Sequence, residues 1–110
     1  MQKRRIYIAG KYSAPSTLET LNNIHDGIHA CVRAVKSGYS PYCPWLDHQY
    51  HLIDKTITVK DYQRISMDWL EVSQEVWVLP NSESSKGTQA EILRAQELRI
   101  PVRYLSKGER

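Results

Sequence analysis

Strand-like and helix-like segments alternate along this sequence of 110 residues. Runs rich in β-branched and aromatic side chains occupy residues 4–10, 39–43, 75–80 and 100–105. Apolar residues recur every three or four positions across residues 16–38, 61–72 and 88–98. Strands that alternate with helices through short connections pair in parallel and place helices on both faces of the sheet. We therefore predict an α/β fold: a small, doubly wound, Rossmann-like or flavodoxin-like domain with a mostly parallel sheet of four to five strands.

The first helical stretch carries the clearest boundary signals. Ser16 and Glu19 form a Ser-x-x-Glu capping box, and Gly38 is typical of a helix end. The apolar residues of this stretch predict a long amphipathic helix: Leu18, Leu21, Ile24, Ile28, Cys31 or Val32, and Val35. In the next strand-like run, Pro41 favours an edge position or a strand end, and residues 44–57 are expected to form an aromatic and polar loop.

The size and hydropathy of the chain limit its class. Its length suits one domain, which we expect over residues 1–110. The apolar runs are far shorter than the ~20 residues that a membrane-spanning helix needs. The N-terminal MQKRR leads into IYIAG and not into the apolar core of a signal peptide. These features predict a soluble, cytoplasmic protein without a membrane partner.

The charge balance favours a small anionic ligand. The formal net charge is +3, and after the basic cluster Lys3, Arg4 and Arg5 the charges alternate in sign. Proteins that bind nucleic acid polymers usually concentrate basic residues in stripes that contact many phosphates. We therefore expect no nucleic acid polymer as a partner. Cys31 and Cys43 lack CxxC spacing, which predicts reduced thiols and no disulfide or zinc site.

Three segments are expected to surround a ligand site. In doubly wound sheets, ligands bind beyond the carboxyl ends of the strands, where the strand order reverses. The segments that follow the first three strand-like runs are residues 10–16, 42–51 and 81–91. Polar and aromatic side chains are concentrated in all three, so we predict that these segments form the site.

The sequence SSKGTQAE at residues 84–91 is the strongest candidate for an anion site. At the start of a helix, Ser85, Lys86 and Gly87 offer a hydroxyl group, an ammonium group and free backbone amides to a phosphate. Glu91 lies one turn farther along the same helix. Spacing alone allows two interpretations of Glu91: a solvated glutamate stabilised by the helix dipole, or a carboxylate that projects into the pocket.

The first strand-like run adds further candidates. Tyr7 is expected to reach a carboxylate on a neighbouring helix, and Gly10 permits a ligand to approach the backbone closely. Lys11, Tyr12 and Ser13 follow directly and are expected to contact the ligand.

The three tryptophans are expected to divide between site and core. Trp45, beside Pro44, is the aromatic residue that we expect to line the pocket and stack on a base. Trp69 and Trp77 are expected in the hydrophobic core.

The sequence lacks the common cofactor and metal motifs. Neither GxxxxGK[ST] nor G-x-G-x-x-G follows the first strand, which disfavours ATP hydrolysis and dinucleotide binding. His25 and His29 stand four apart, but no H-E-x-x-H and no paired cysteines accompany them. A nucleophilic Cys43 would need a base such as His48. We predict neither a metal nor a cofactor.

Three segments together resemble one enzyme superfamily. They are KRRIYIAGKYS, MDWLEVSQEVWVLP and SSKGTQAEILRAQELRIPVRYL. In order and spacing they resemble the nucleoside 2-deoxyribosyltransferase superfamily over nearly the whole chain. The resemblance is closest to the short phage and bacterial domains of this superfamily without assigned activity, and to the 2'-deoxynucleoside 5'-monophosphate N-glycosidases. It implies that residues 1–110 are one domain of this type, which forms a homo-oligomer, a dimer or higher.

The resemblance also implies roles for individual residues. Glu91 matches the family's nucleophile, which attacks C1' of the sugar, and Tyr7 matches the tyrosine that hydrogen-bonds to it. Ser85 matches a position that is aspartate in the nucleoside transferases and serine in the monophosphate hydrolases. With Lys86 beside it, this serine favours a 5'-monophosphate as the ligand. Asp68 is the nearest match to an acidic residue that contacts the sugar or the base.

Several positions depart from the family's pattern. Asp68 matches only with a shift of one residue, since strict register places Met67 there, and its usual aspartate partner is replaced by Glu75. Lys11 replaces the usual proline of the first turn, and Arg99 replaces the final glycine. If Asp68 lies outside the site, protonation of the leaving base lacks an obvious donor.

We predict an enzyme that hydrolyses the N-glycosidic bond of a (deoxy)nucleoside 5'-monophosphate and releases free base and sugar phosphate. Water is the favoured acceptor for a reason that the resemblance supplies. The family's transferases are longer chains, whose C-terminal residues hold the acceptor base, whereas SKGER follows Leu105 here. Three alternatives fit the same residues. They are a non-catalytic protein that senses or sequesters a nucleotide, a deoxyribosyltransferase that exchanges bases, and a phosphoribohydrolase suggested by the similarity of KGTQAE to G-x-G-T-x-x-E.

Overall fold

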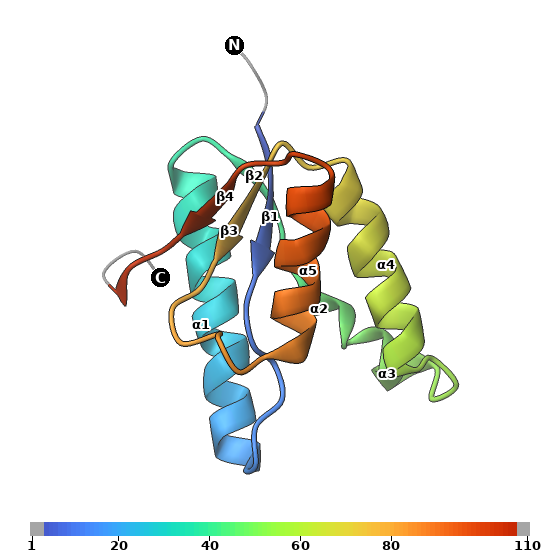
Figure 1. Cartoon of the computed structure of the whole chain (residues 1–110). Helices are drawn as coiled ribbons and strands as arrows, with labels where there is room; N and C mark the ends of the chain where they lie inside the picture. Colours follow the sequence, from blue (N-terminus) through green and yellow to red (C-terminus); the bar gives the residue numbers. More distant parts are fainter. Residues whose placement is uncertain (1–3, 108–110) are drawn as a thin grey trace.

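The computed structural model describes residues 4–107 and alternates strands with helices, as the sequence predicts (Figure 1). The strands are β1 (Arg5–Ala9), β2 (Ser40–Tyr42), β3 (Glu75–Val78) and β4 (Val102–Tyr104). The helices are α1 (Thr17–Lys36), α2 (Pro44–Asp47), α3 (Tyr50–Ile53), α4 (Val59–Glu71) and α5 (Lys86–Glu97).

The four strands form one parallel sheet in the order β2-β1-β3-β4. The chain moves from β1 to one side for β2 and then returns to the other side of β1 for β3, so the strand order reverses between β1 and β3. This order confirms the predicted doubly wound α/β fold. It also confirms the edge position that Pro41 predicts for β2. A ligand site is therefore expected where β1 and β3 end.

The sheet is covered on both faces, with α1 on one side and α4 and α5 on the other (Figure 1). Alternate residues of β1 enter different cores: Ile6 and Ile8 pack with α1, whereas Tyr7 packs with α4 and α5. Trp77 is buried in the α1 core, as predicted. The same prediction is wrong for Trp69, which is 52% exposed because it lies at the edge of the sheet, where it stacks on Tyr42.

Helix α1 begins and ends where the sequence predicts. The Ser16 hydroxyl accepts a hydrogen bond from the backbone amide of Glu19, and Gly38 has a φ of +91°, which glycine adopts without strain. The residues that α1 buries are mostly small: Asn23, Gly27, Ala30, Cys31 and Ala34. Several large apolar residues on the same helix are exposed instead: Leu18, Leu21, Val32 and Val35. The apolar spacing thus correctly predicts that this segment is a helix. It does not predict which side faces the sheet, because most of the large apolar residues point away from it.

Other helix boundaries differ from the predictions for local reasons. The expected loop 44–57 contains α2 and α3, and α2 has Pro44 in its first turn, where proline favours a helix start. Helix α4 starts before residue 61 because Thr58 and Asp61 form a capping box. Helix α5 starts before residue 88 because Ser85 caps it.

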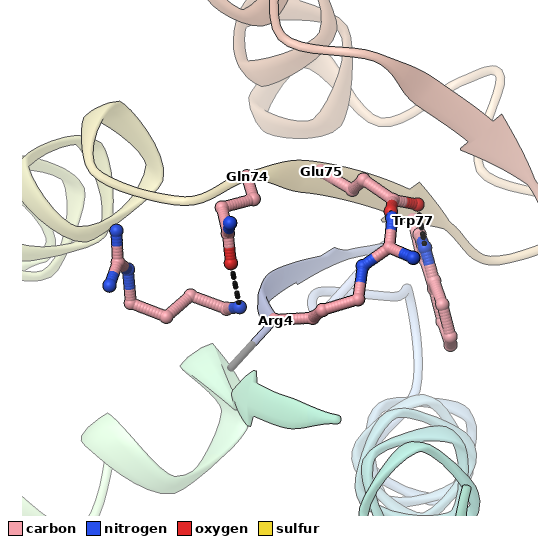
Figure 2. Close-up of polar contacts among 5 residues, drawn as sticks. Arg4, Gln74, Glu75 and Trp77 are labelled. Carbon is pink, nitrogen blue, oxygen red and sulfur yellow. Dashed lines mark hydrogen bonds and ion pairs between the residues drawn. The ribbon is translucent and has the colours of Figure 1, made fainter. Parts of the chain in front are cut away.

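Polar contacts join the starts of β1 and β3, at the end of the sheet opposite to the expected site (Figure 2). Arg4 forms an ion pair with Glu75, and the indole N–H of Trp77 donates to the Glu75 carboxylate at 3.1 Å. The backbone amide of Arg5 donates to the side-chain oxygen of Gln74 at 2.8 Å. Glu75 therefore has a structural role here, distant from the carboxyl ends of the strands.

Within residues 4–107, no helix combines the length and the apolar character needed to span a membrane.

Candidate functional site

A cavity of about 830 Å³ lies at the carboxyl ends of β1 and β3. Its walls come from four segments: the loop after β1, the region of α2, one face of α4, and the loop and first turns of α5. The strand order reverses at this point, so the position of the cavity follows from the topology.

Glu91 lies in this cavity and is held from below by Tyr7. The Tyr7 hydroxyl, on the completely buried side chain of a β1 residue, donates a hydrogen bond to the Glu91 carboxylate on α5. The side chain of Ser66 on α4 also hydrogen-bonds to the Tyr7 hydroxyl, and Tyr42 stacks on the ring. Three elements and the neighbouring strand β2 therefore fix the position of this carboxylate.

The surroundings of Glu91 change its acidity. Burial raises the pKa of the Glu91 carboxyl group from 4.5 to about 7, and the hydrogen bond from Tyr7 opposes part of that rise. Burial, followed by the negative charge of Glu91, raises the pKa of Tyr7 well above its ordinary value. Tyr7 therefore remains a hydrogen-bond donor at all physiological pH values. Glu91 is the single acidic residue among the described residues that line the cavity.

The start of α5 forms one end of the cavity. Ser85 is the N-cap residue, and its hydroxyl oxygen accepts hydrogen bonds from the Thr88 amide at 3.2 Å and from the Thr88 hydroxyl at 2.9 Å. The first amides of a helix have no intrahelical partner, and the helix dipole makes this end positive. Ser85 thus shapes the helix start, and Lys86 and Gly87 line the cavity beside it.

Basic side chains line the cavity from three segments. Lys11 follows β1, Arg64 is on α4 and Lys86 is on α5. With Glu91 as the one carboxylate beside these three cations, the electrostatic potential of the cavity favours an anion.

An aromatic row forms another wall. Tyr12 and His48 stack with ring centroids 3.8 Å apart, and His48 lies against Tyr62 at 4.5 Å. Burial lowers the pKa of His48, so its imidazole is neutral at pH 7. A flat apolar ring, such as a nucleobase, would find matching surfaces along this wall.

Trp45 lines the cavity but does not offer a free ring face, contrary to the prediction. It is only 4% exposed, because its indole packs closely on Gly27 of α1. Its N–H donates to the Lys11 carbonyl at 3.3 Å and so supports the loop after β1. Gly10 likewise is required by packing, since a Cβ there would lie 2.7 Å from Leu79 and 3.0 Å from Trp45.

Most of the residues predicted for the site are brought together by the fold. The cavity is lined by Gly10, Lys11, Tyr12, Ser13, Trp45, Ser85, Lys86, Gly87 and Glu91. Tyr7 lies beneath it and contacts Glu91. Asp68 is exposed on α4 and does not line the cavity, whereas Met67 does, as the strict register implies. Asp68 is therefore not placed to contact a ligand in this cavity.

Asp68 was the one α4 residue predicted for the site, and the structure places other residues of α4 there instead. This helix turns Val59, Gln63, Ser66 and Met67 toward the cavity at helical spacing. One sequence feature indicates that α4 lines a site. Gln63 and Ser66 share a helix face with buried Tyr62, and polar side chains on a packed face usually have a partner or a ligand.

The remaining candidates lie elsewhere. Cys43 is outside the cavity lining, and its side chain hydrogen-bonds to that of Cys31 in the α1 core. His25 and His29 stack on each other along α1. Across residues 4–107, no three His, Cys, Asp or Glu side chains form a group that could hold a metal ion.

Comparison with other proteins places the chain in a family. A search of the curated proteins finds no match to this sequence. A family model described as a domain of unknown function, DUF7768, matches residues 4–105. Since this match covers almost the entire chain, the protein belongs to the DUF7768 family.

Proposed function

We propose that the protein hydrolyses the N-glycosidic bond of a nucleoside or deoxynucleoside 5'-monophosphate, with Glu91 as the nucleophile. The observation that carries this proposal is the hydrogen-bonded pair of Glu91 and Tyr7 inside a cavity that is otherwise basic. A carboxylate beside an anion site is costly unless it has a function, because it repels the same ligands that the cations attract.

The pair has the properties that a glycosidic nucleophile needs. A carboxylate can attack C1' of the sugar and later leave again, and it stabilises the positive charge that develops on the sugar. Tyr7 holds this carboxylate in line by donating a proton to a hydrogen bond without adding a second negative charge. With its pKa raised to about 7, Glu91 is about half ionised at neutral pH and is more basic than an exposed glutamate.

The start of α5 supports a phosphate on the substrate. Backbone amides at a helix N-terminus and the side chains of Lys86 and Lys11 provide donors and positive charge for a dianion. Ser85 adds a neutral hydroxyl group at this position, where an aspartate would repel phosphate. The sugar would then lie between this phosphate site and Glu91, and the base would lie toward the row of Tyr12, His48 and Tyr62.

The proposed reaction has two steps. A Glu91 oxygen forms a bond to C1' while the bond from C1' to the base nitrogen breaks, and the base leaves with the electron pair and takes up a proton from solvent. Water then attacks C1', its oxygen forms the new bond and its proton returns to solvent, and Glu91 leaves as a carboxylate. The sum is nucleotide plus water giving free base plus sugar 5-phosphate.

One observation favours a second candidate, a non-catalytic protein that binds a nucleotide. Asp68 lies outside the cavity, so the described lining residues include no second carboxyl group to protonate the leaving base. A binding protein would use the same basic cavity without cleaving the ligand.

The experiment is chromatography of free bases after incubation of the protein with a panel of ribo- and deoxyribonucleoside 5'-monophosphates and the corresponding nucleosides. The proposal predicts release of base from at least one monophosphate and much slower release from its nucleoside. Equal rates for both would overturn the phosphate site, and no release from any compound would overturn the reaction. Addition of a second free base distinguishes hydrolysis from base exchange, since a transferase would form a new nucleotide.

A further inference from the structure

Two cysteines from different parts of the chain meet in the core between α1 and the sheet. Cys31 lies on α1 and is 6% exposed, whereas Cys43 directly precedes α2 and is half-buried. Cys43 packs against the hydrophobic cluster that contains Cys31, and the Cys31 thiol donates a hydrogen bond to the Cys43 sulfur. This contact places the two sulfur atoms next to each other, which is the first requirement for a disulfide.

A second contact fixes the backbone of this region on α1. Trp45, two residues after Cys43, packs its buried indole ring on Gly27. Gly27 and Cys31 are four residues apart on α1 and therefore lie on the same face of that helix, one turn apart. Residues 43–45 thus dock on one stretch of α1 through two neighbouring contacts, and the fold itself holds the two thiols together.

The two thiols differ in reactivity, because the thiolate is the form of cysteine that reacts with oxidants. The hydrogen bond from Cys31 lowers the pKa of Cys43, although burial and the negative charge of Asp47 oppose part of this effect. The same hydrogen bond, together with burial, raises the pKa of Cys31. Cys43 is also the more exposed of the two. A small oxidant therefore reacts first with Cys43, beside a protonated Cys31.

We propose that Cys31 and Cys43 form a reversible oxidation site, at which hydrogen peroxide converts the two thiols into an intramolecular disulfide. The Cys43 thiolate attacks one peroxide oxygen, the O–O bond breaks, and Cys43 becomes a sulfenic acid while hydroxide leaves and takes up a proton. The Cys31 sulfur then attacks the Cys43 sulfur, its proton passes to the departing hydroxyl group, and water leaves. In sum, two thiols lose two electrons to one peroxide, which gives a disulfide and two water molecules.

This inference does not depend on the proposed function, since neither cysteine lines the cavity. Cys43 immediately precedes Pro44 and Trp45, however, and both of these residues line it. The disulfide would therefore join this wall of the cavity covalently to α1.

Peptide mapping of the full chain tests the site. The reduced protein is treated with hydrogen peroxide at neutral pH, its remaining thiols are blocked with N-ethylmaleimide in denaturant, and it is digested with trypsin. Trypsin cleaves after Arg33 and Lys36, which lie between the two cysteines, so the disulfide is detected as two linked peptides. We expect these linked peptides from a monomeric protein, and both thiols after treatment with dithiothreitol.

Three results of this mapping would overturn the proposal. They are two blocked thiols after peroxide treatment, a sulfinic acid at Cys43 with Cys31 still free, and a disulfide between two chains.

Single-cysteine variants test the order of the steps, with circular dichroism to verify the fold. In Cys31→Ala the sulfenic acid at Cys43 lacks its partner, so we expect dimedone to label it after peroxide treatment. In Cys43→Ala we expect Cys31 to stay reduced, because it is buried and protonated. A folded Cys31→Ala variant without the dimedone label, or oxidation of Cys31 in Cys43→Ala as fast as thiol loss in the wild type, would overturn the role of Cys43.

The stability of the oxidised protein tests whether the fold accommodates the bond. A disulfide that fits the native geometry restricts the unfolded chain and so stabilises the fold. Thermal unfolding of the oxidised wild type is expected about 10 °C above that of the reduced protein. Peroxide-treated Cys43→Ala is the matched control and should show no rise. An oxidised wild type that unfolds at a lower temperature than the reduced protein would overturn the claim that the two sulfur atoms are placed for this bond.

Discussion

The hydroxyl group of Tyr7 on β1 donates a hydrogen bond to the carboxylate of Glu91 on α5, a residue 84 positions away in the sequence. Tyr7 is completely buried and Glu91 is partly buried. The parallel sheet creates this contact, because it places the end of β1 beside the strand that leads into α5. The resulting properties of Glu91 lead to the first two predictions.

Tyr7→Phe is expected to shift the pH dependence of base release upward. Since the hydrogen bond from Tyr7 lowers the pKa of Glu91, its removal leaves burial unopposed and the pKa rises further. The attacking form is the carboxylate, so the rising limb of activity, centred at about pH 7 in the wild type, moves to higher pH. Hydrogen bonds to charged groups are worth about 1.5–3 kcal/mol, so release at pH 7 should fall about tenfold or more. A pH profile with an unmoved rising limb would contradict this role of Tyr7.

Glu91→Gln is expected to stabilise the fold at alkaline pH. A raised pKa in the folded state means that ionisation of Glu91 opposes folding. The loss of stability begins near its ordinary pKa of 4.5 and is complete above about pH 7. The free energy of unfolding of the variant should exceed that of the wild type by up to about 3 kcal/mol at pH 8, with little difference at pH 4.

Urea denaturation at the two pH values measures this difference. Glu83→Gln is the matched control, because Glu83 is exposed in the loop before α5 and does not line the cavity. A Glu91→Gln variant that is no more stable than the wild type at pH 8 would show that the carboxylate is not destabilising in the fold.

Ser85→Asp separates the capping role of Ser85 from its role in ligand choice. Aspartate is as good an N-cap as serine, whereas Ser85→Ala removes the hydroxyl that caps α5 and should cost about 1 kcal/mol. The aspartate also places a negative charge at the phosphate site. Calorimetric titration should therefore show binding of the monophosphate weakened about tenfold or more, with little change for the nucleoside. Equal weakening of both ligands would argue against a phosphate at the start of α5.

Gly27→Ala is expected to destabilise the fold through Trp45. A Cβ at Gly27 would lie 2.2–2.5 Å from three atoms of the indole ring, so the helix and the ring must separate. Overpacking of this kind costs about 1–3 kcal/mol. Gly87→Ala is the matched control. It has no atom within 4 Å of the new Cβ and lies in a helix, so it should raise stability by up to about 1 kcal/mol. Thermal unfolding measures the stability of each variant relative to the wild type, which should fall for Gly27→Ala and rise for Gly87→Ala.

Local sequence signals were sufficient for the strands, the parallel sheet and the boundaries of α1. The capping box at Ser16 and the glycine at position 38 act on neighbouring residues, so they are visible in the sequence itself. The position of Glu91 at the carboxyl ends of the strands also follows from the alternation of strands and helices.

The side of α1 that faces the sheet was not predictable from hydrophobicity. Apolar periodicity predicts burial of the largest residues, but here Gly27 and Ala30 face the sheet because the Trp45 ring and the strand side chains already fill the space. The same limit applies to Trp69, since a large aromatic side chain at the edge of a small sheet can stack on Tyr42 and stay exposed.

Arg99 stands where the family pattern that this sequence resembles has a glycine, and its backbone conformation is one that glycine favours. Arg99 has a φ of +59° directly after α5, in the left-handed region where glycine is the favoured residue. A glycine would therefore fit this position without strain. In this chain, Arg99 adopts the same left-handed conformation. No local signal in the sequence indicates that an arginine here keeps the turn.

The central claim is that Glu91 attacks the sugar. The most direct test is to measure base release at pH 8 by wild type and Glu91→Gln, using the monophosphate that the wild type cleaves best, together with the binding constant of each protein for that nucleotide. We expect the variant to bind the monophosphate at least as tightly, since it loses a negative charge from the cavity, and its release of base to be abolished. Release by Glu91→Gln at the wild-type rate would contradict the claim and remove the carboxylate from the mechanism.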